Sequence, residues 1–411
     1  MNTKEQLMLE VFEKNGGIFQ LMPAFVFRKN SKPGKRLRLH PNDYYACRPE
    51  HGAVEVRFMA SVIRGGNDEF TPWDEGLSYI TLDGVDPENK ILFKDAIDIL
   101  GAKLIGQQLW DEYGTWPMNG KFFDFGGPGG GPLFHHLHLG FEDAARVNKG
   151  GKAEGYFYPE QYNSYPGTFP YTFFGFSPDV TKEEVRKRME MYLTGDNRLT
   201  ELSRAYRIEL ESAWYTAPGV LHAPGSMLTY EPQLNSDASS VFENVVAGER
   251  YGYGSLTGDV PEDKKYDLDY IMSLLDWDRN VDPDYRAHNF RPKELIEEDE
   301  KHASYWIMYG NPYISATQLV VKPGQTVLVK DKAAYGCILV QGYGKFGSYD
   351  CETPHLIRLG QPTADEFFVS EKAAQEGVLV TNNSKYEPLV MLKHFASNNV
   401  HKPEMADFKI R

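Results

Sequence analysis

Cysteine is scarce in this chain of 411 residues. The three cysteines, Cys47, Cys337 and Cys351, lie far apart and form no Cys-x-x-Cys pair. This spacing gives neither a disulfide framework nor a thiolate metal site. We therefore expect free thiols in a reducing compartment, and a cytoplasmic protein.

Long hydrophobic runs are also missing. Hydrophobic residues make up 41% of the chain, yet no apolar run approaches the roughly 20 residues that span a bilayer. At the N-terminus, Leu7, Met8, Val11 and Phe12 recur at helical spacing among charges. This pattern predicts a docked helix over residues 1–14 and not a signal peptide, which needs a basic start and an uninterrupted apolar core. We expect no membrane partner.

Positive charge is in deficit. The chain has 44 Lys and Arg against 58 Asp and Glu, a formal net charge of −14, which argues against a nucleic-acid partner. The basic residues nevertheless gather in the segment 34–41, which contains Arg36 and Arg38. Two interpretations stay open: a subsite for an anion such as phosphate or carboxylate, or a solvated surface strand.

The most informative stretch is a predicted strand rich in histidine, residues 134–139. Side chains alternate between the two faces of a strand, so His136 and His138 should project together and His135 should face the other way. His135 is accordingly expected to be structural.

Two later segments add donors of the same kind. Glu154 opens an aromatic-rich strand, and His222 follows the turn signal Pro218-Gly219. Three imidazoles and one carboxylate are typical of a single divalent transition metal, although histidines satisfied within a core are the alternative. We predict that His136, His138, Glu154 and His222 bind one metal ion.

The remaining sequence predicts a mainly β protein with a few helices. Residues 89–113 have apolar positions at helical intervals, and this helix should break near Gly101. A second helical insertion over 179–203 opens with the capping box Thr181 to Glu184.

The segment Gly126–Pro132 lacks the Gly-Lys-Ser/Thr ending of a phosphate loop, so we interpret it as a flexible lead-in, with a lid as the alternative. Short strands with regular turns from residue 303 onward predict a second barrel. The predicted domains are 1–245, a connector over 246–302, and 303–411.

Several motifs, in this order, resemble those of one family. They are Gly34-Lys35-Arg36-Leu37, the strand 54–61, Leu137-His138, Lys152-Ala153-Glu154, Thr181 to Glu184, Pro218 to Ala223, Asn235 to Ser239, Arg286 with Arg291-Pro292, and Gly342-Tyr343-Gly344. Together they resemble the type I mannose-6-phosphate isomerases, which are double-cupin proteins.

The resemblance implies two cupin (jelly-roll) β-barrels with a helical insertion and peripheral helices. It places the metal in the first barrel and none in the second. Two departures stand out: His136 replaces a Gln of the family, and Ser240, Val241 and Phe242 stand where the family has an Arg. Fold and metal therefore carry over, whereas mannose 6-phosphate as substrate does not.

The expected function is a metal-dependent sugar or sugar-phosphate isomerase, in which a protein base moves a proton between adjacent carbons. The expected metal is zinc, with iron, manganese or nickel as alternatives. We expect Lys152 and Glu211 to be catalytic, with His135 and Glu231 as further candidates. The expected partner is a small sugar or sugar phosphate, and a homodimer is the expected assembly.

Substrate contacts are expected from four residues. Arg36, Arg38 and Arg57 would bind a phosphate or carboxylate, and Asp237 would orient a ligand or a substrate hydroxyl, or cap a turn. Two alternatives to the isomerase remain open: another cupin metalloenzyme (lyase, epimerase or oxygenase), or a sugar-binding protein without turnover.

Overall fold

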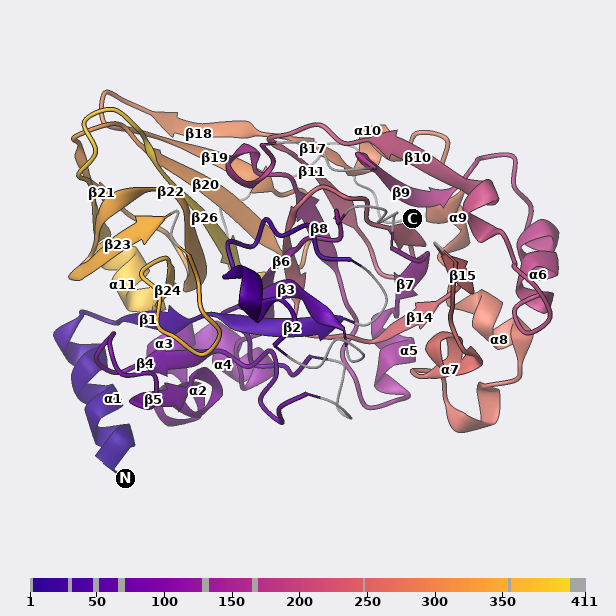
Figure 1. Cartoon of the computed structure of the whole chain (residues 1–411), viewed down its shortest axis with the longest axis horizontal. Helices are drawn as coiled ribbons and strands as arrows, with labels where there is room; N and C mark the ends of the chain where they lie inside the picture. The colour runs from indigo at the N-terminus through magenta and orange to yellow at the C-terminus, as the bar shows by residue number, and fades with distance from the viewer. Residues whose placement is uncertain are drawn as a thin grey trace.

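The computed structural model describes residues 3–28, 32–46, 52–65, 71–127, 133–164, 169–246, 248–353 and 356–399. The chain forms two β structures that lie side by side, with helices at both ends (Figure 1). The predicted mainly β fold with two barrels is confirmed. Most of the predicted lead-in, residues 128–132, and Cys47 lie outside the described residues, while Cys337 and Cys351 are buried free thiols.

The first barrel consists of two sheets. A seven-stranded sheet has the order β17-β11-β8-β13-β6-β3-β2, and a five-stranded sheet has the order β10-β9-β12-β7-β14. The two sheets face each other, since Phe174 of β9 stacks on Trp214 of β11 with ring centroids 5.2 Å apart. The strands are β2 (Ala24–Arg28), β3 (Ala53–Met59), β6 (Met118–Phe123), β7 (His136–His138), β8 (Glu154–Phe157), β9 (Tyr171–Phe176), β10 (Ser203–Arg207), β11 (Ser212–Thr216), β12 (His222–Ala223), β13 (Thr229–Leu234), β14 (Ser239–Val241) and β17 (Phe290–Pro292).

The second barrel is built from a twelve-stranded sheet with the main order β18-β19-β20-β26-β22-β24-β1-β4-β5. Strands β21, β23 and β25 branch from it, because the long strand β22 pairs with β26 and β24 near its start and with β23 and β25 near its end. The strands are β1 (Ile18–Met22), β4 (Tyr79–Thr81), β5 (Lys90–Leu92), β18 (Glu294–Glu298), β19 (His302–Met308), β20 (Ser315–Val321), β21 (Thr326–Val329), β22 (Tyr335–Phe346), β23 (Tyr349–Thr353), β24 (Glu366–Val369), β25 (Val378–Asn382) and β26 (Leu389–Phe395).

The sheets cross the predicted domain boundaries. Strand β1 pairs antiparallel with β24, with Ile18 opposite Val369, and β17 of the predicted connector pairs with β11 of the first barrel. The division at residues 245 and 302 stays a prediction. In the structure, however, N-terminal strands complete the C-terminal sheet.

Most of the helices gather at the two ends of the molecule (Figure 1). Helix α1 confirms the predicted N-terminal helix. The predicted helical segment 89–113 is helical only from Phe93, because residues 90–92 form strand β5 paired with β4. The helical part is broken at Gly101, as predicted, and again at Gly106, both with positive φ. The capping box of Thr181 and Glu184 starts α6 as predicted. The helices are α1 (Thr3–Lys14), α2 (Phe93–Leu100), α3 (Ala102–Ile105), α4 (Gln107–Tyr113), α5 (Phe141–Ala145), α6 (Lys182–Glu190), α7 (Tyr253–Thr257), α8 (Leu268–Ser273), α9 (Trp277–Asn280), α10 (Tyr285–Asn289) and α11 (Glu371–Glu376).

Short 3-10 helices and a small hairpin complete the described elements. They are η1 (Pro41–Asp43), η3 (Glu160–Tyr162), η4 (Leu199–Leu202), η5 (Glu262–Lys264), β15 (Val245–Val246) and β16 (Glu249–Arg250). None of the helices in the described part of the chain has the length and apolar character needed to cross a bilayer.

Buried polar contacts join the two barrels. Arg57 of β3 donates to both carboxylate oxygens of Asp365 at 2.8 and 2.9 Å and to Glu366 at 2.8 Å. His394 of β26 lies 2.9 Å from the hydroxyl of Tyr230. Burying a charge without a partner is very unfavourable, so these contacts fix how the barrels meet.

Candidate metal centre

Strand pairing brings three predicted ligands together. Strand β7 lies between β12 and β14, and His222 of β12 stands directly opposite His136 of β7. His138, two residues further along β7, projects to the same side, and its ring centroid lies 5.2 Å from that of His222. The ligand atoms of the three histidines all lie within 4.8 Å of one another.

Glu154 of β8 approaches this group from the seven-stranded sheet. Its two carboxylate oxygens lie 3.0 Å from Nε2 of His222 and 3.2 Å from Nε2 of His138. The structure thus brings the four predicted ligands into one buried cluster, which draws on both sheets of the first barrel.

Backbone carbonyls orient all three imidazoles. A carbonyl oxygen can only accept a hydrogen bond, so each Nδ1 is the donor and each Nε2 keeps its lone pair for the cluster. The Nδ1 atoms donate to the carbonyl oxygens of Phe134, Ala238 and Val220, at 3.0 Å for His136, 3.1 Å for His138 and 2.8 Å for His222.

The donor atoms fit a divalent metal ion. Ligand bonds of about 2.0–2.1 Å in a tetrahedral zinc site place the ligand atoms about 3.3 Å apart, close to the separations between Glu154 and the imidazoles. Within the described residues, Nε2 of His222 and both oxygens of Glu154 are buried without a hydrogen bond of good geometry, although they lie in contact. Buried polar atoms in this condition are what a bound cation would satisfy.

Two lysines and a second carboxylate adjoin the cluster. Nζ of Lys152 lies 2.9 Å from Glu154, 3.0 Å from Nε2 of His138 and 3.5 Å from Glu231. Lys121 of β6 lies 2.6 Å from Glu231 of β13. Acidic and basic groups thus alternate from Lys121 through Glu231 and Lys152 to Glu154.

Burial and these neighbours shift the protonation equilibria. Burial and the adjacent Glu154 carboxylate raise the pKa of Glu231 to about 8. Burial opposes the charge of Glu154, but the ammonium of Lys152 and the nearby imidazoles hold its pKa well below the ordinary value. Burial, together with the Lys152 ammonium, lowers the pKa of His138 to about 4. The two carboxylates therefore differ in their affinity for a proton.

His135 lies on the opposite side of β7, as the alternation predicts. Its Nδ1 lies 2.7 Å from Glu243, which also accepts hydrogen bonds from the backbone N–H of His135 and from the hydroxyl of Thr200. These contacts attach the start of β7 to the helical insertion and leave His135 apart from the three ligand histidines.

The three predicted anion-binding arginines lie on the other face of the seven-stranded sheet. Lys121 and Phe123 of β6 face the cluster: Lys121 contacts Glu231, and Phe123 packs against Tyr156, whose ring lies 6.0 Å from that of His222. Phe122 must point the other way. Arg57 stands directly opposite Phe122 in the register and shares its face.

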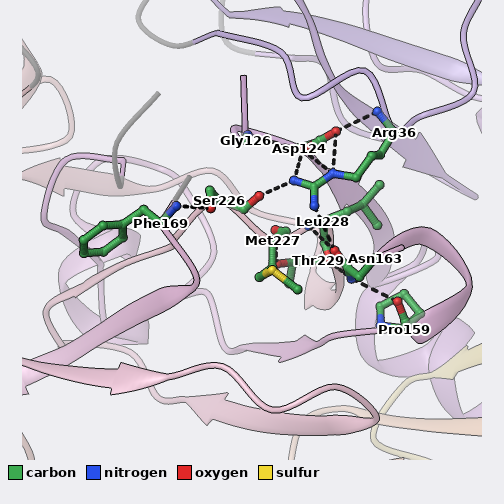
Figure 2. A network of polar contacts seen from close by, with 10 residues as sticks. All are labelled: Arg36, Asp124, Gly126, Pro159, Asn163, Phe169, Ser226, Met227, Leu228 and Thr229. Atoms are coloured by element: carbon green, nitrogen blue, oxygen red, sulfur yellow. Dashed lines mark hydrogen bonds and ion pairs between the residues drawn. The ribbon is translucent and has the colours of Figure 1, made fainter. Parts of the chain in front are cut away.

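Arg36 and Arg38 lie on that outer face as well. Figure 2 shows the fork of Arg36 directed at Asp124, the carbonyl oxygen of Ser226 and the side chain of Asn163. Arg38 stacks on Tyr162, with 3.9 Å from its guanidinium carbon to the ring centroid. Tyr162 in turn packs against Phe122. Arg36 and Arg38 line a cavity of about 530 Å³, and its other lining residues include Gln161 and Tyr162 but not the three histidines.

The other two predicted site residues, Asp237 and Glu211, lie at the ends of strands and have different surroundings. Asp237 lies in the turn after β13 and acts electrostatically on Lys152. Glu211 lies in the turn before β11, where its carboxylate pairs with Lys293 at 2.8 Å and accepts from Gln318 at 3.0 Å. The structure places Asp237 beside the charged row and gives Glu211 partners in the second barrel.

Lys121 was absent from the sequence-based candidates, and Glu231 ranked low among them. The signal that could have found them is period-two spacing of polar residues within strands that are otherwise buried. Asn119 and Lys121 alternate with Met118, Gly120 and Phe122 in β6, and Glu231 and Gln233 alternate likewise in β13.

Comparison with known proteins identifies the fold. No protein-family model matches the chain, and a comparison with curated proteins gave no match. Among solved structures, the chain is similar to a candidate mannosephosphate isomerase from Archaeoglobus fulgidus, with 13% identity and a TM-score of 0.60 over 92% of this chain and 97% of that one.

Two further structures are similar over 92% of this chain and 99% of theirs. Mannose 6-phosphate isomerase from Bacillus subtilis shows 14% identity and a TM-score of 0.57. A single-substitution variant of phosphomannose isomerase from Salmonella typhimurium shows 9% and 0.59. The chain therefore has the cupin fold of these proteins, as its motifs led us to expect, at identities that establish the fold alone.

Proposed function

We propose that this protein is a metal-dependent isomerase of sugars or sugar phosphates. The observation that carries the proposal is the unbroken buried series from Lys121 through Glu231 and Lys152 to Glu154, which ends at the three histidines. In this proposal the series supplies proton-transferring groups directly beside the ion that the histidines would hold. The fold shared with mannose 6-phosphate isomerases supports the same reaction class.

His136, His138, His222 and Glu154 would hold one divalent ion, with zinc as the first candidate and iron, manganese or nickel as alternatives. When bound, such an ion supplies Lewis acidity that makes the C–H bond beside a sugar carbonyl more acidic. The donor set does not select one metal, so the metal content of the purified protein decides this point.

The chain's own residues would move and hold the proton. Glu231 offers a carboxylate oxygen that is held by Lys121 at 2.6 Å and Lys152 at 3.5 Å. In the proposed reaction Glu231 takes a proton from the hydroxyl-bearing carbon and gives a proton to the adjacent carbonyl carbon, and the hydroxyl proton passes to the former carbonyl oxygen. The Lys152 ammonium stabilises the negative charge that these oxygens carry in between. Glu211 has no place in this scheme, because it pairs with Lys293.

The test is a panel of aldoses, ketoses and their phosphates, followed by NMR in D2O with metal-loaded and chelated protein. Isomerisation should require the metal, and solvent deuterium should enter at the carbon next to the carbonyl. Glu231→Gln should lower kcat by about 100-fold or more, the usual scale for losing a general base. Glu211→Gln makes the same chemical change at a carboxylate that pairs with Lys293 and Gln318, and serves as the matched control. Turnover that survives chelation, or that falls with Glu211→Gln and not with Glu231→Gln, would disprove the assignment.

A second candidate, a lyase, epimerase or oxygenase, rests on the same four donors, because three imidazoles and one carboxylate also suit iron and manganese. Iron in the purified protein together with oxygen uptake on candidate substrates would favour an oxygenase. Tight sugar binding without a product by NMR would favour a binding protein.

A further inference from the structure

Uncharged polar side chains flank Glu154 on both sides across the inner face of the seven-stranded sheet, with Thr216 on one side and Gln233 and Asn119 on the other. Gln233 of β13 stands directly opposite both Asn119 of β6 and Glu154 of β8, and Thr216 of β11 stands opposite Glu154. Residues directly opposite in an antiparallel pair share a face. Asn119, Gln233 and Thr216, which we call the amide row, therefore lie on the same face as the metal-ligand candidate Glu154.

The amide row is buried and short of partners. Asn119 and Gln233 are fully buried and Thr216 is 1% exposed. Within the described residues, the side-chain oxygen and nitrogen of Asn119, the side-chain oxygen of Gln233 and the hydroxyl of Thr216 have no hydrogen-bond partner. Leaving a buried polar group in this state is unfavourable. Four such atoms in one row indicate a partner that the chain itself does not supply.

The chemistry of the row selects neutral hydroxyl groups. A hydroxyl both donates and accepts hydrogen bonds, as a carboxamide and a threonine hydroxyl do. A phosphate offers acceptors only, and Glu154 and Glu231 beside the row already carry negative charge. The cations that contact these carboxylates among the described residues are Lys121 and Lys152, and each already forms an ion pair.

The arginines do not change this balance. Arg36 pairs with Asp124, Arg57 pairs with Asp365 and Glu366, and Arg38 lies on the outer face. A phosphate bound beside the amide row would thus meet more acceptors than donors.

We propose that the amide row is the subsite for the hydroxyl groups of an unphosphorylated aldose or ketose. The inference deepens the proposed isomerase and rests on it for the identity of the reacting end, which would lie toward Glu154 and Lys152. The hydroxyl-bearing carbons would extend along Gln233 and Asn119.

The test measures binding of compounds that cannot isomerise. Calorimetry on the full-length, metal-loaded protein compares D-mannitol and D-sorbitol with their 6-phosphates and with inorganic phosphate. The hexitols should bind at least as tightly as the phosphates. Gln233→Met and Thr216→Val, which keep size and remove hydrogen bonding, should each weaken hexitol binding by about tenfold, the equivalent of one lost hydrogen bond. Their metal affinity should stay within about twofold of the original.

A matched control lies in the second barrel. The hydroxyl of Thr317 is also buried without a partner, so Thr317→Val makes the same change away from the site and should leave hexitol binding unaltered. The inference is overturned if the 6-phosphates bind ten times more tightly than the hexitols, or if no hexitol binds. It is equally overturned if Gln233→Met and Thr216→Val behave like Thr317→Val, since the row would then hold only water.

The two proposals fail separately. Hexitol binding through the amide row without turnover of any aldose would reject the isomerase and leave the subsite standing. Turnover of sugar phosphates alone would support the isomerase and reject the amide row as a subsite for unphosphorylated sugars.

Discussion

The interiors of the two barrels differ sharply in chemistry although both are built from antiparallel strands. The first barrel turns imidazoles, carboxylates, ammonium groups and amides toward one another next to its apolar core. The second barrel encloses an apolar cluster that includes Leu339, Phe346, Phe367, Val380 and Met391. Antiparallel strands thus enclose a buried cluster of polar groups in the first barrel and a mainly apolar cluster in the second. The residue at each inward position decides which.

The largest expected effect comes from removing one imidazole of the histidine cluster that we propose to hold the metal. His222→Ala should lower metal affinity by more than about 100-fold, because loss of a mere outer-shell partner already costs about 10- to 100-fold, and turnover should be abolished. Metal content by mass spectrometry and a competitive chelator titration measure this. His394→Asn is the control at another buried histidine. If the His222→Ala protein bound metal as tightly as the original protein, the histidine cluster would not be the metal site that distinguishes the first barrel from the second.

The second largest effect should come from the apolar barrel. Phe367 is fully buried and its ring lies 4.9 Å from that of Phe346. Phe367→Ala should lower the free energy of unfolding by about 3–5 kcal/mol, as urea denaturation would show, and should leave metal affinity unchanged below the transition. A parallel loss of metal affinity would mean that the second barrel shapes the site after all.

A pH effect is expected where the barrels meet. Burial lowers the pKa of His394 to about 3, whereas a histidine in an unfolded chain has a pKa of about 6.5. The folded state therefore resists protonation, and this contribution to stability is present above about pH 6.5 and is lost as the pH falls toward 3. At about 1.4 kcal/mol per pKa unit, the loss is about 3 kcal/mol by about pH 4.

Chemical denaturation at several pH values measures this dependence. His394→Asn should lower stability at pH 7 and should flatten the profile between pH 6.5 and 4. An unchanged profile in the variant would assign the acid sensitivity to other groups.

The smallest expected effect concerns the helical insertion. The hydroxyl of Thr181 caps α6 through the N–H of Glu184, and Thr181→Ala should cost about 1 kcal/mol. Since α6 lies at the periphery, metal affinity should not change. A weakened metal site in this variant would reveal that the insertion supports the ligands more directly than its position indicates.

Local patterns in the sequence sufficed for a large part of this structure. Period-two spacing placed His136 and His138 on one face and His135 on the other, Gly101 marked the helix break, and the Thr181 box marked a helix start. Each of these rests on contacts within a few residues, which a single sequence displays directly.

Local patterns did not predict which residues pair over long sequence distances, or which face of a strand lines the histidine cluster. Arg57 was expected to bind an anion, but its carboxylate partners stand more than 300 positions away, at Glu366 of β24 and at Asp365 just before that strand. Likewise, Lys121 can be recognised as the ion-pair partner of Glu231 only from the pairing of β6 with β13, which sets the two residues opposite each other. Alternation predicts that two faces exist, and only the strand register tells which face meets the histidines.

The pairing of β1 with β24 has a consequence for biosynthesis. A ribosome releases Ile18 early and Val369 near the end, so for most of translation β1 carries exposed backbone groups without its final neighbour. The second barrel should consequently close only after the chain is almost fully made. A truncated polypeptide ending before β24 should be a preferred client of molecular chaperones.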